Sequence, residues 1–179
     1  KGFTIRRGHA ASGGAILIEG ASAPSISNCG FDSCSSDTGG AIAVTGGSPN
    51  IRVSEFTNNS ATTGGAIAIS GGTPALLSLA FSQNTVTGSG GALAITGGTL
   101  DMHRCRFFYN EAGLDGGAIY QSDGSAVLAE SHIQENVALE GAGIYFGPKA
   151  TSSLLNTTVS VNRATASFGG ISLNVAANI

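Results

Sequence analysis

The chain has 179 residues, 41% of them hydrophobic, which is the size of one ordinary domain with enough apolar residues for a core. Charged residues make up only 11% and the formal net charge is −3, whereas soluble domains carry about 25% charged residues. This balance excludes a basic face for nucleic acid or anionic lipid. The sequence also contains no run of about 18 apolar residues, so it does not predict insertion into a membrane. Low charge with many Ser and Thr residues favours an extracellular or cell-surface location.

One pattern of about 26 residues repeats seven times along the chain. The first column of each copy is apolar: Ile5, Phe31, Phe56, Phe81, Phe107, Ile133 and Val159. The second column follows three residues later: Gly8, Cys34, Asn59, Asn84, Asn110, Asn136 and Asn162. The third column follows a pair of glycines or a relaxed copy of one: Ile16, Ile42, Ile67, Leu93, Ile119, Ile144 and Ile171.

Each copy carries two short apolar runs in which every second residue is apolar. They are of the Ile67-x-Ile69 type and the Leu77-x-Leu79-x-Phe81 type, and such alternation is typical of strands. Turn signals such as Gly71-Gly72-Thr73-Pro74 separate the runs, and no copy has a helical pattern of ten residues. The sequence therefore predicts an all-β parallel solenoid of about seven coils of 25–27 residues, stacked about 4.8 Å apart.

The Asn column predicts a buried structural ladder. An Asn side chain carries both a donor and an acceptor, so stacked Asn residues can pair with inward-pointing backbone groups at a turn and with each other. The ladder would comprise Asn59, Asn84, Asn110, Asn136 and Asn162 and fail at Gly8 and Cys34. The alternative is a row of exposed turn residues. Asn84→Leu should cost roughly 1–3 kcal/mol if the ladder is buried.

The glycine pair predicts a turn with positive φ or a close backbone approach. If the aliphatic residues after it point inward, period-two alternation turns the alanines outward. Two columns would then form a flat, weakly apolar candidate docking strip: Ala15, Ala41, Ala66, Ala92 and Ala118 in one, and Ala43, Ala68, Ala94, Tyr120 and Tyr145 in the other. The alternative is that small residues merely fit a flat sheet.

The pairing of Gly-Gly-Ala-Ile with Phe-x-x-Asn resembles the repeats of chlamydial polymorphic membrane proteins, which are autotransporter adhesins. Phe-x-x-Asn stands at Phe56–Asn59, Phe81–Asn84 and Phe107–Asn110, with relaxed forms at Ile133–Asn136 and Val159–Asn162. Similar tetrapeptides occur in pectin-lyase-like proteins. The resemblance implies a right-handed parallel β-helix, a passenger outside the outer membrane, and a role in virulence. A leucine-rich repeat is the rival solenoid, but it requires more Leu and a helical return.

Few side chains suggest chemistry. Asp115 and Glu140 both precede the glycine position on adjacent coils and could form an acid pair, although Ser12, Thr38 and Thr63 occupy the same column, as in a solvated turn. His9, His103 and His132 fall in different columns. We therefore expect no catalytic site, no metal and no cofactor. Cys29, Cys34 and Cys105 lack metal-type spacing and are interpreted as small buried residues.

The leading hypothesis is a non-catalytic adhesin or structural stalk that binds a host-cell surface protein or glycan through its outward faces, or packs on neighbouring β-helix coils. The alternatives are part of a carbohydrate-active β-helix enzyme and an ice-binding solenoid, for which the best hydroxyl ladder is Thr45, Ser70, Thr96 and Ser122. The first residues already fit the middle of a repeat, so residues 1–179 are expected to be one segment of a longer protein. Neither residues 1–3 nor residues 176–179 resemble a polar cap, which predicts end-to-end self-association.

Overall fold

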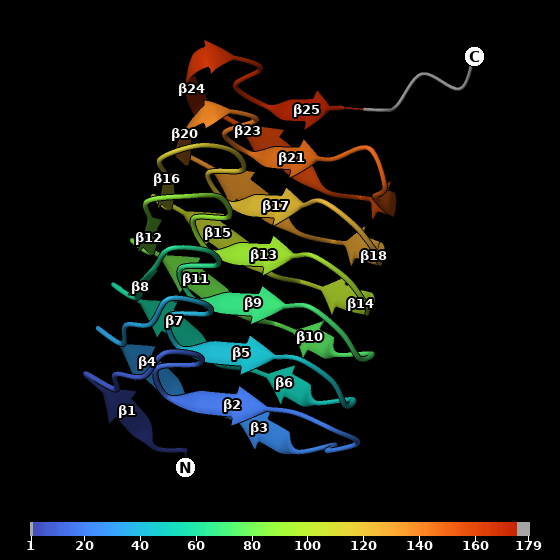
Figure 1. Cartoon of the computed structure of the whole chain (residues 1–179). Coiled ribbons are helices and arrows are strands. Elements are labelled where there is room, and N and C mark those ends of the chain that lie inside the picture. Colours follow the sequence, from blue (N-terminus) through green and yellow to red (C-terminus); the bar gives the residue numbers. More distant parts are fainter. Residues whose placement is uncertain (1, 175–179) are drawn as a thin grey trace.

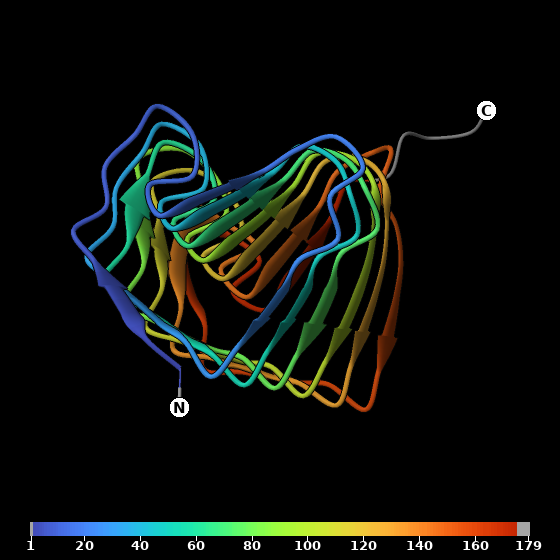
Figure 2. The ribbon, with the colours of Figure 1, turned by 90° about the horizontal axis from the view of Figure 1, so that it is seen from below.

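The computed structural model describes residues 2–174, and no helix occurs in that range. The chain winds into coils that lie one above another (Figure 1), and the view along the stack shows successive coils following nearly the same outline (Figure 2). All strand pairs are parallel and fall into four sheets. The predicted parallel solenoid is therefore confirmed. Within residues 2–174 no helix is available to span a membrane, and the terminal residues 1 and 176–179, part of the uncapped-end prediction, lie outside the described range.

We name the sheets by their place in the coil. The Phe sheet contains β1 (Thr4–Arg6), β4 (Gly30–Asp32), β7 (Glu55–Thr57), β11 (Ala80–Ser82), β15 (Arg106–Phe108), β19 (His132–Gln134) and β23 (Thr158–Ser160). The short sheet contains β8 (Ser60–Ala61), β12 (Thr85–Val86), β16 (Glu111–Ala112), β20 (Val137–Glu140) and β24 (Arg163–Ser167).

Two further sheets complete the coil. The Ala sheet contains β2 (Ile16–Ile18), β5 (Ile42–Val44), β9 (Ile67–Ile69), β13 (Leu93–Ile95), β17 (Ile119–Gln121), β21 (Ile144–Phe146) and β25 (Ile171–Leu173). The return sheet contains β3 (Ser25–Ser27), β6 (Asn50–Arg52), β10 (Ala75–Leu77), β14 (Thr99–His103), β18 (Ser125–Ala129) and β22 (Thr151–Leu155).

The columns of the repeat become ladders in the sheets. Ile67 pairs with Ile42 on one side and Leu93 on the other, and all three are fully buried. In the Phe sheet the rings of four consecutive coils stack face to face, with centroids 4.6–4.9 Å apart. These stacks and the aliphatic ladders of the Ala and return sheets form one continuous core.

The alternation in the run Leu77-x-Leu79-x-Phe81 predicts a single strand, but the structure does not contain one there. The run contains the end of β10 and the start of β11, which are separated by Ser78 and Leu79, and Ser78 has a left-handed conformation with φ of 55°. The bend changes which residues face inward, so Leu76 rather than Leu77 is buried in β10. Each coil therefore has an additional corner between the return sheet and the Phe sheet.

The glycine pair acts as predicted. Gly64 has a φ of +65°, a conformation that residues with a Cβ rarely adopt. At Gly65, a Cβ would lie closer than 3.0 Å to the carbonyl oxygen of Gly91 on the next coil. One glycine therefore makes the turn, and the other allows two backbones to approach.

The first alanine column of the predicted docking strip does not point outward. The N–H groups of Ala66 and Ile67 both donate to the carbonyl oxygen of Ala92, at 2.9 and 3.0 Å. Two residues thus oppose one, as in a β-bulge, and the alternation begins only at Ile67. This column is buried in the core at Ala41, Ala66, Ala92 and Ala118 and packs against it at Ala15.

The Asn ladder is present as predicted. The side-chain oxygen of Asn84 accepts hydrogen bonds from the backbone N–H and the side-chain NH₂ of Asn59, both at 3.0 Å. The NH₂ group of Asn84 donates to the Phe56 carbonyl and to the side-chain oxygen of Asn110. The same pattern continues through Asn136 to Asn162. At its other end the ladder stops where Cys34 takes the Asn position, its N–H donating to Asn59 at 3.0 Å.

All three cysteines are buried free thiols, which confirms their interpretation as small core residues. Burial raises the pKa of the Cys105 thiol to about 12. A thiol with such a pKa is not ionised at neutral pH and is a poor nucleophile.

Candidate functional site

The second alanine column of the predicted strip lies at the bottom of a groove. Ala43, Ala68 and Ala94 are the central residues of β5, β9 and β13 and stand outside the main core. They are nevertheless only 0–6% exposed, because Thr and Ser side chains rise on both sides. The result is a hollow of about 200 Å³ instead of the flat exposed strip that alternation predicts. We call it the Ala groove.

The walls of the Ala groove carry hydroxyl groups and no charge. One wall contains Thr38 and Thr63, whose backbones pair in an isolated bridge. The other wall contains Thr45, Ser70 and Thr96. An apolar floor between neutral hydroxyl groups suits a ligand that is itself uncharged and has both apolar and hydroxyl-bearing faces.

Bulky residues stand at both ends of the groove. In register with the floor, Leu17 of β2 pairs with Ala43 and Tyr120 of β17 pairs with Ala94. Tyr120 stacks on Tyr145 of β21, with ring centroids 5.5 Å apart and planes 20° apart. Both rings are partly exposed. The tyrosines therefore form an aromatic platform that continues the line of the groove.

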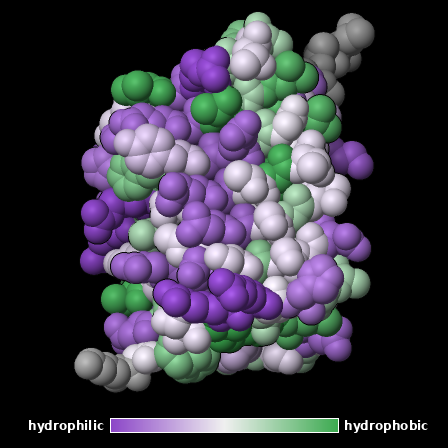
Figure 3. Space-filling view, turned by 90° about the vertical axis from the view of Figure 1, so that its left-hand side faces the viewer, coloured by the Kyte–Doolittle hydropathy of each residue, from purple (hydrophilic) through white to green (hydrophobic). Residues whose placement is uncertain are grey.

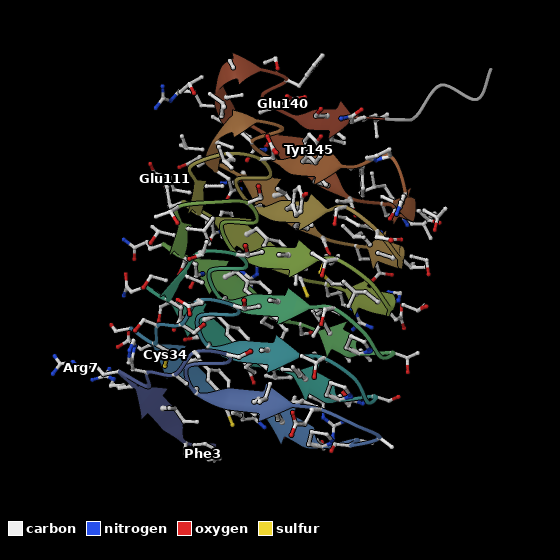
Figure 4. All side chains as sticks on the ribbon, viewed as in Figure 1. Phe3, Arg7, Cys34, Glu111, Glu140 and Tyr145 are labelled. Carbon is white, nitrogen blue, oxygen red and sulfur yellow. The ribbon has the colours of Figure 1, made fainter. Side chains whose placement is uncertain are left out.

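Two carboxyl groups lie beside the tyrosine platform. Asp115 and Glu140 occupy paired positions on adjacent coils, as their spacing predicts, and Figure 4 shows Glu140 near Tyr145 at the C-terminal end of the molecule. The Ser172 hydroxyl donates to Glu140 at 2.6 Å. Burial, and then the neighbouring charge of Glu140, raises the pKa of Asp115. No ion pair to either group occurs among residues 2–174.

Asp115→Asn is expected to raise the melting temperature at pH 7. Because the pKa of Asp115 is raised in the folded state, ionising its carboxyl group lowers the stability of the fold. The full destabilisation is present when the pH lies above the raised pKa. It fades as the pH falls towards the ordinary value of 3.8, so the two proteins should melt alike near pH 3. Thermal melts at both pH values test this, with Glu111→Gln on the exposed side of β16 as control. An equal difference at both pH values would contradict it.

The remaining candidates do not assemble into a site. The His9 ring forms a hydrogen bond with the Ser35 hydroxyl at 2.9 Å. The His103 ring contacts Asp101 at 2.8 Å on the return sheet. His132 lies on the Phe sheet. Residues 2–174 hold no group of three or more His, Cys, Asp or Glu side chains arranged for a metal ion.

The side of the molecule that carries the short sheet has a hollow of about 320 Å³, which is lined mostly by residues of β8, β12 and β16. Figure 3 shows hydrophilic and neutral atoms over most of this side, with hydrophobic atoms in separate spots. Val86, Ala112 and Ala138 of the short sheet face inward into a small second core with Ala142.

Both hydroxyl columns were identified from the sequence, one as a solvated turn position and the other as a hydroxyl ladder, but they were not predicted to flank the alanines as walls. The signal is a fixed interval from the floor, since Thr38 and Thr63 stand five residues before Ala43 and Ala68. Hydroxyl residues likewise stand two residues after Ala43, Ala68 and Ala94. These intervals are visible in the sequence, but only the structure shows that both sets rise above the alanines.

Comparison with known proteins identifies the fold family. A family model described as a right-handed β-helix region matches residues 41–179. Neither a curated protein nor a solved structure matches the chain significantly. The match agrees with the predicted right-handed β-helix and with the broad pectin-lyase-like class. It gives no specific support to the narrower resemblance to chlamydial polymorphic membrane proteins.

Proposed function

Since the chain belongs to the family of right-handed β-helix regions, we propose that it is a non-catalytic binding segment of a secreted or cell-surface protein. Its ligand is an extended neutral glycan that lies along the Ala groove and stacks on the tyrosine platform. An adhesin passenger, as the chlamydial resemblance implies, is one setting for such a segment. Packing on neighbouring coils and end-to-end self-association are further proposals about its partners.

The observation that carries this proposal is the continuity of groove and platform. The floor of Ala43, Ala68 and Ala94 and the rings of Tyr120 and Tyr145 occupy one column of the Ala sheet. Neighbouring strands are about 4.8 Å apart, so the column offers a regular row of contacts across five coils. Aromatic rings pack well against the apolar face of a sugar while their hydroxyl groups remain available for hydrogen bonds.

The double substitution Tyr120→Ala and Tyr145→Ala should weaken glycan binding by about tenfold or more, since two stacking contacts of about 1 kcal/mol each are lost. Ala68→Leu should weaken it too by filling the groove. Binding is measured on a panel of neutral and acidic oligosaccharides and on fixed animal cells.

The matched control is Tyr109→Ala, which removes a tyrosine that is 61% exposed away from the groove. Retention of full binding by both groove variants, with correct folding by circular dichroism, would overturn the proposal. Equal loss in the Tyr109 variant would show that binding does not use the groove.

A carbohydrate-active enzyme is the second candidate, and the paired carboxyl groups of Asp115 and Glu140 favour it. The raised pKa of Asp115 is a property of general acids in glycoside cleavage. Release of new reducing ends from polysaccharides, abolished by Asp115→Asn, would establish this function in place of simple binding. An ice-binding solenoid is a third reading, and thermal hysteresis in the purified protein would support it. The recess of the Ala groove favours a glycan over a flat ice surface.

A further inference from the structure

A second hollow, which we call the corner cleft, lies at the bend between the return sheet and the Phe sheet. Its volume is about 500 Å³, within the range of about 300–1,000 Å³ that is common for small-molecule sites. It belongs to different sheets from the Ala groove and shares no lining residue with it.

The cleft exists because one coil has small side chains where its neighbours have long ones. Ser78 and Ala80 line its centre. Ala80 of β11 pairs with Glu55 of β7 on one side and with Arg106 of β15 on the other. Two coil steps of about 4.8 Å therefore place the backbones of Glu55 and Arg106 about 10 Å apart, with only a methyl group between them.

The two walls carry opposite charges that are not neutralised across the gap. Arg104 forms an ion pair with Glu130 at 3.1 Å, so these two charges offset each other. Glu55 and Arg106 have no ion-pair partner among residues 2–174. His132 lies directly beyond Arg106 in the same column. One side of the cleft is thus acidic and the other basic, and both unpaired groups line it.

We propose that the corner cleft binds a small zwitterion, a molecule that carries an ammonium group and a carboxylate at its two ends, as amino acids do. The ammonium group donates to the Glu55 carboxylate. The ligand carboxylate accepts from the Arg106 guanidinium, whose planar set of donors matches a carboxylate, and the His132 ring lies within the same wall. A purely anionic ligand would contact only the basic wall, and the Glu55 carboxylate would then face another negative charge.

The test is a series of unbranched amino acids of increasing length: glycine, β-alanine, 4-aminobutyrate and 6-aminohexanoate. Each is titrated into the folded protein, and binding is followed by NMR shifts of the Arg106 Nε–H and the His132 ring. Because both charged ends are engaged together, one chain length should bind about tenfold more tightly than acetate or methylammonium. Glu55→Gln and Arg106→Gln should each reduce that affinity to the level of the single-charge probes.

Arg7→Gln and Glu19→Gln change the same side-chain types outside the cleft and should bind the best zwitterion as the unsubstituted protein does. Ala80→Phe fills the gap without changing any charge and should abolish binding. The proposal is overturned if all chain lengths bind no better than acetate, or if Ala80→Phe binds as well as the unsubstituted protein while its circular dichroism spectrum is unchanged.

Discussion

Gly65→Ala is expected to lower the free energy of unfolding of this protein by about 3 kcal/mol or more, although it adds only a single methyl group. The new Cβ would lie closer than 3.0 Å to the carbonyl oxygen of Gly91, which is backbone and not a flexible side chain. The N–H of Gly65 also donates to the carbonyl of Gly90 at 3.1 Å. Separating the coils to admit the methyl group would therefore break hydrogen bonds of the stack.

The matched control is Gly170→Ala. Gly170 lies in the equivalent turn of the last described coil, directly before Ile171 and therefore in the column of Ala66. A Cβ there would meet nothing within 4 Å, and its φ is not positive. This substitution should change the free energy of unfolding by no more than about 0.5 kcal/mol. Urea titrations of both variants measure the difference. Equal losses at the two positions would mean that the cost comes from the intrinsic preferences of glycine and not from the neighbouring coil.

The fold could be predicted because every coil repeats the same physical constraints. Register in a parallel solenoid follows directly from the period, so residues in one column of the sequence pair in the structure. Ile42, Ile67 and Leu93 do so, as do Phe31, Phe56 and Phe81. The family match to residues 41–179 supports the same fold.

Two features depended on backbone details that periodicity does not contain. Alternation of period two assumes an unbroken strand, and it fails wherever one residue takes a different conformation. At Ala66 a bulge puts two successive residues on the inside, and at Ser78 a left-handed residue bends the chain. Ser, unlike Gly, gives little local signal for positive φ. The inner alanines and the corner cleft were therefore not predictable from pattern alone.

The candidate site was predicted in part. The column containing Tyr120 and Tyr145, and the pairing of Asp115 with Glu140, followed from spacing and are present. The sequence could not show that the alanines are recessed, because depth depends on how far Thr63 and Ser70 rise above Ala68. Residues in one column are placed by the period, but the shape of a surface depends on adjacent columns together.

Asn84→Leu should destabilise the protein by about 1–3 kcal/mol, because it leaves the buried N–H of Asn59 without an acceptor. The Asn59 N–H loses its acceptor, and the Phe56 carbonyl loses the donor that lies 3.0 Å away. Leu has a similar size but no polar atom, so neither group can be paired from the new side chain. No water can be assumed to replace it, since Asn59 and Asn84 are fully buried.

Asn50→Leu is the matched control, since Asn50 is an exposed residue of β6 with its side chain outside the core. It should change stability by no more than about 0.5 kcal/mol. Urea denaturation gives both values, and hydrogen exchange at the Asn59 amide reports the ladder locally. If Asn84→Leu leaves that amide protected and the midpoint unchanged, the ladder does not stabilise the coils. If exchange accelerates at Asn59 and stability falls, each Asn secures the backbone of the coil before it, which explains why the column persists through five coils while its neighbours vary.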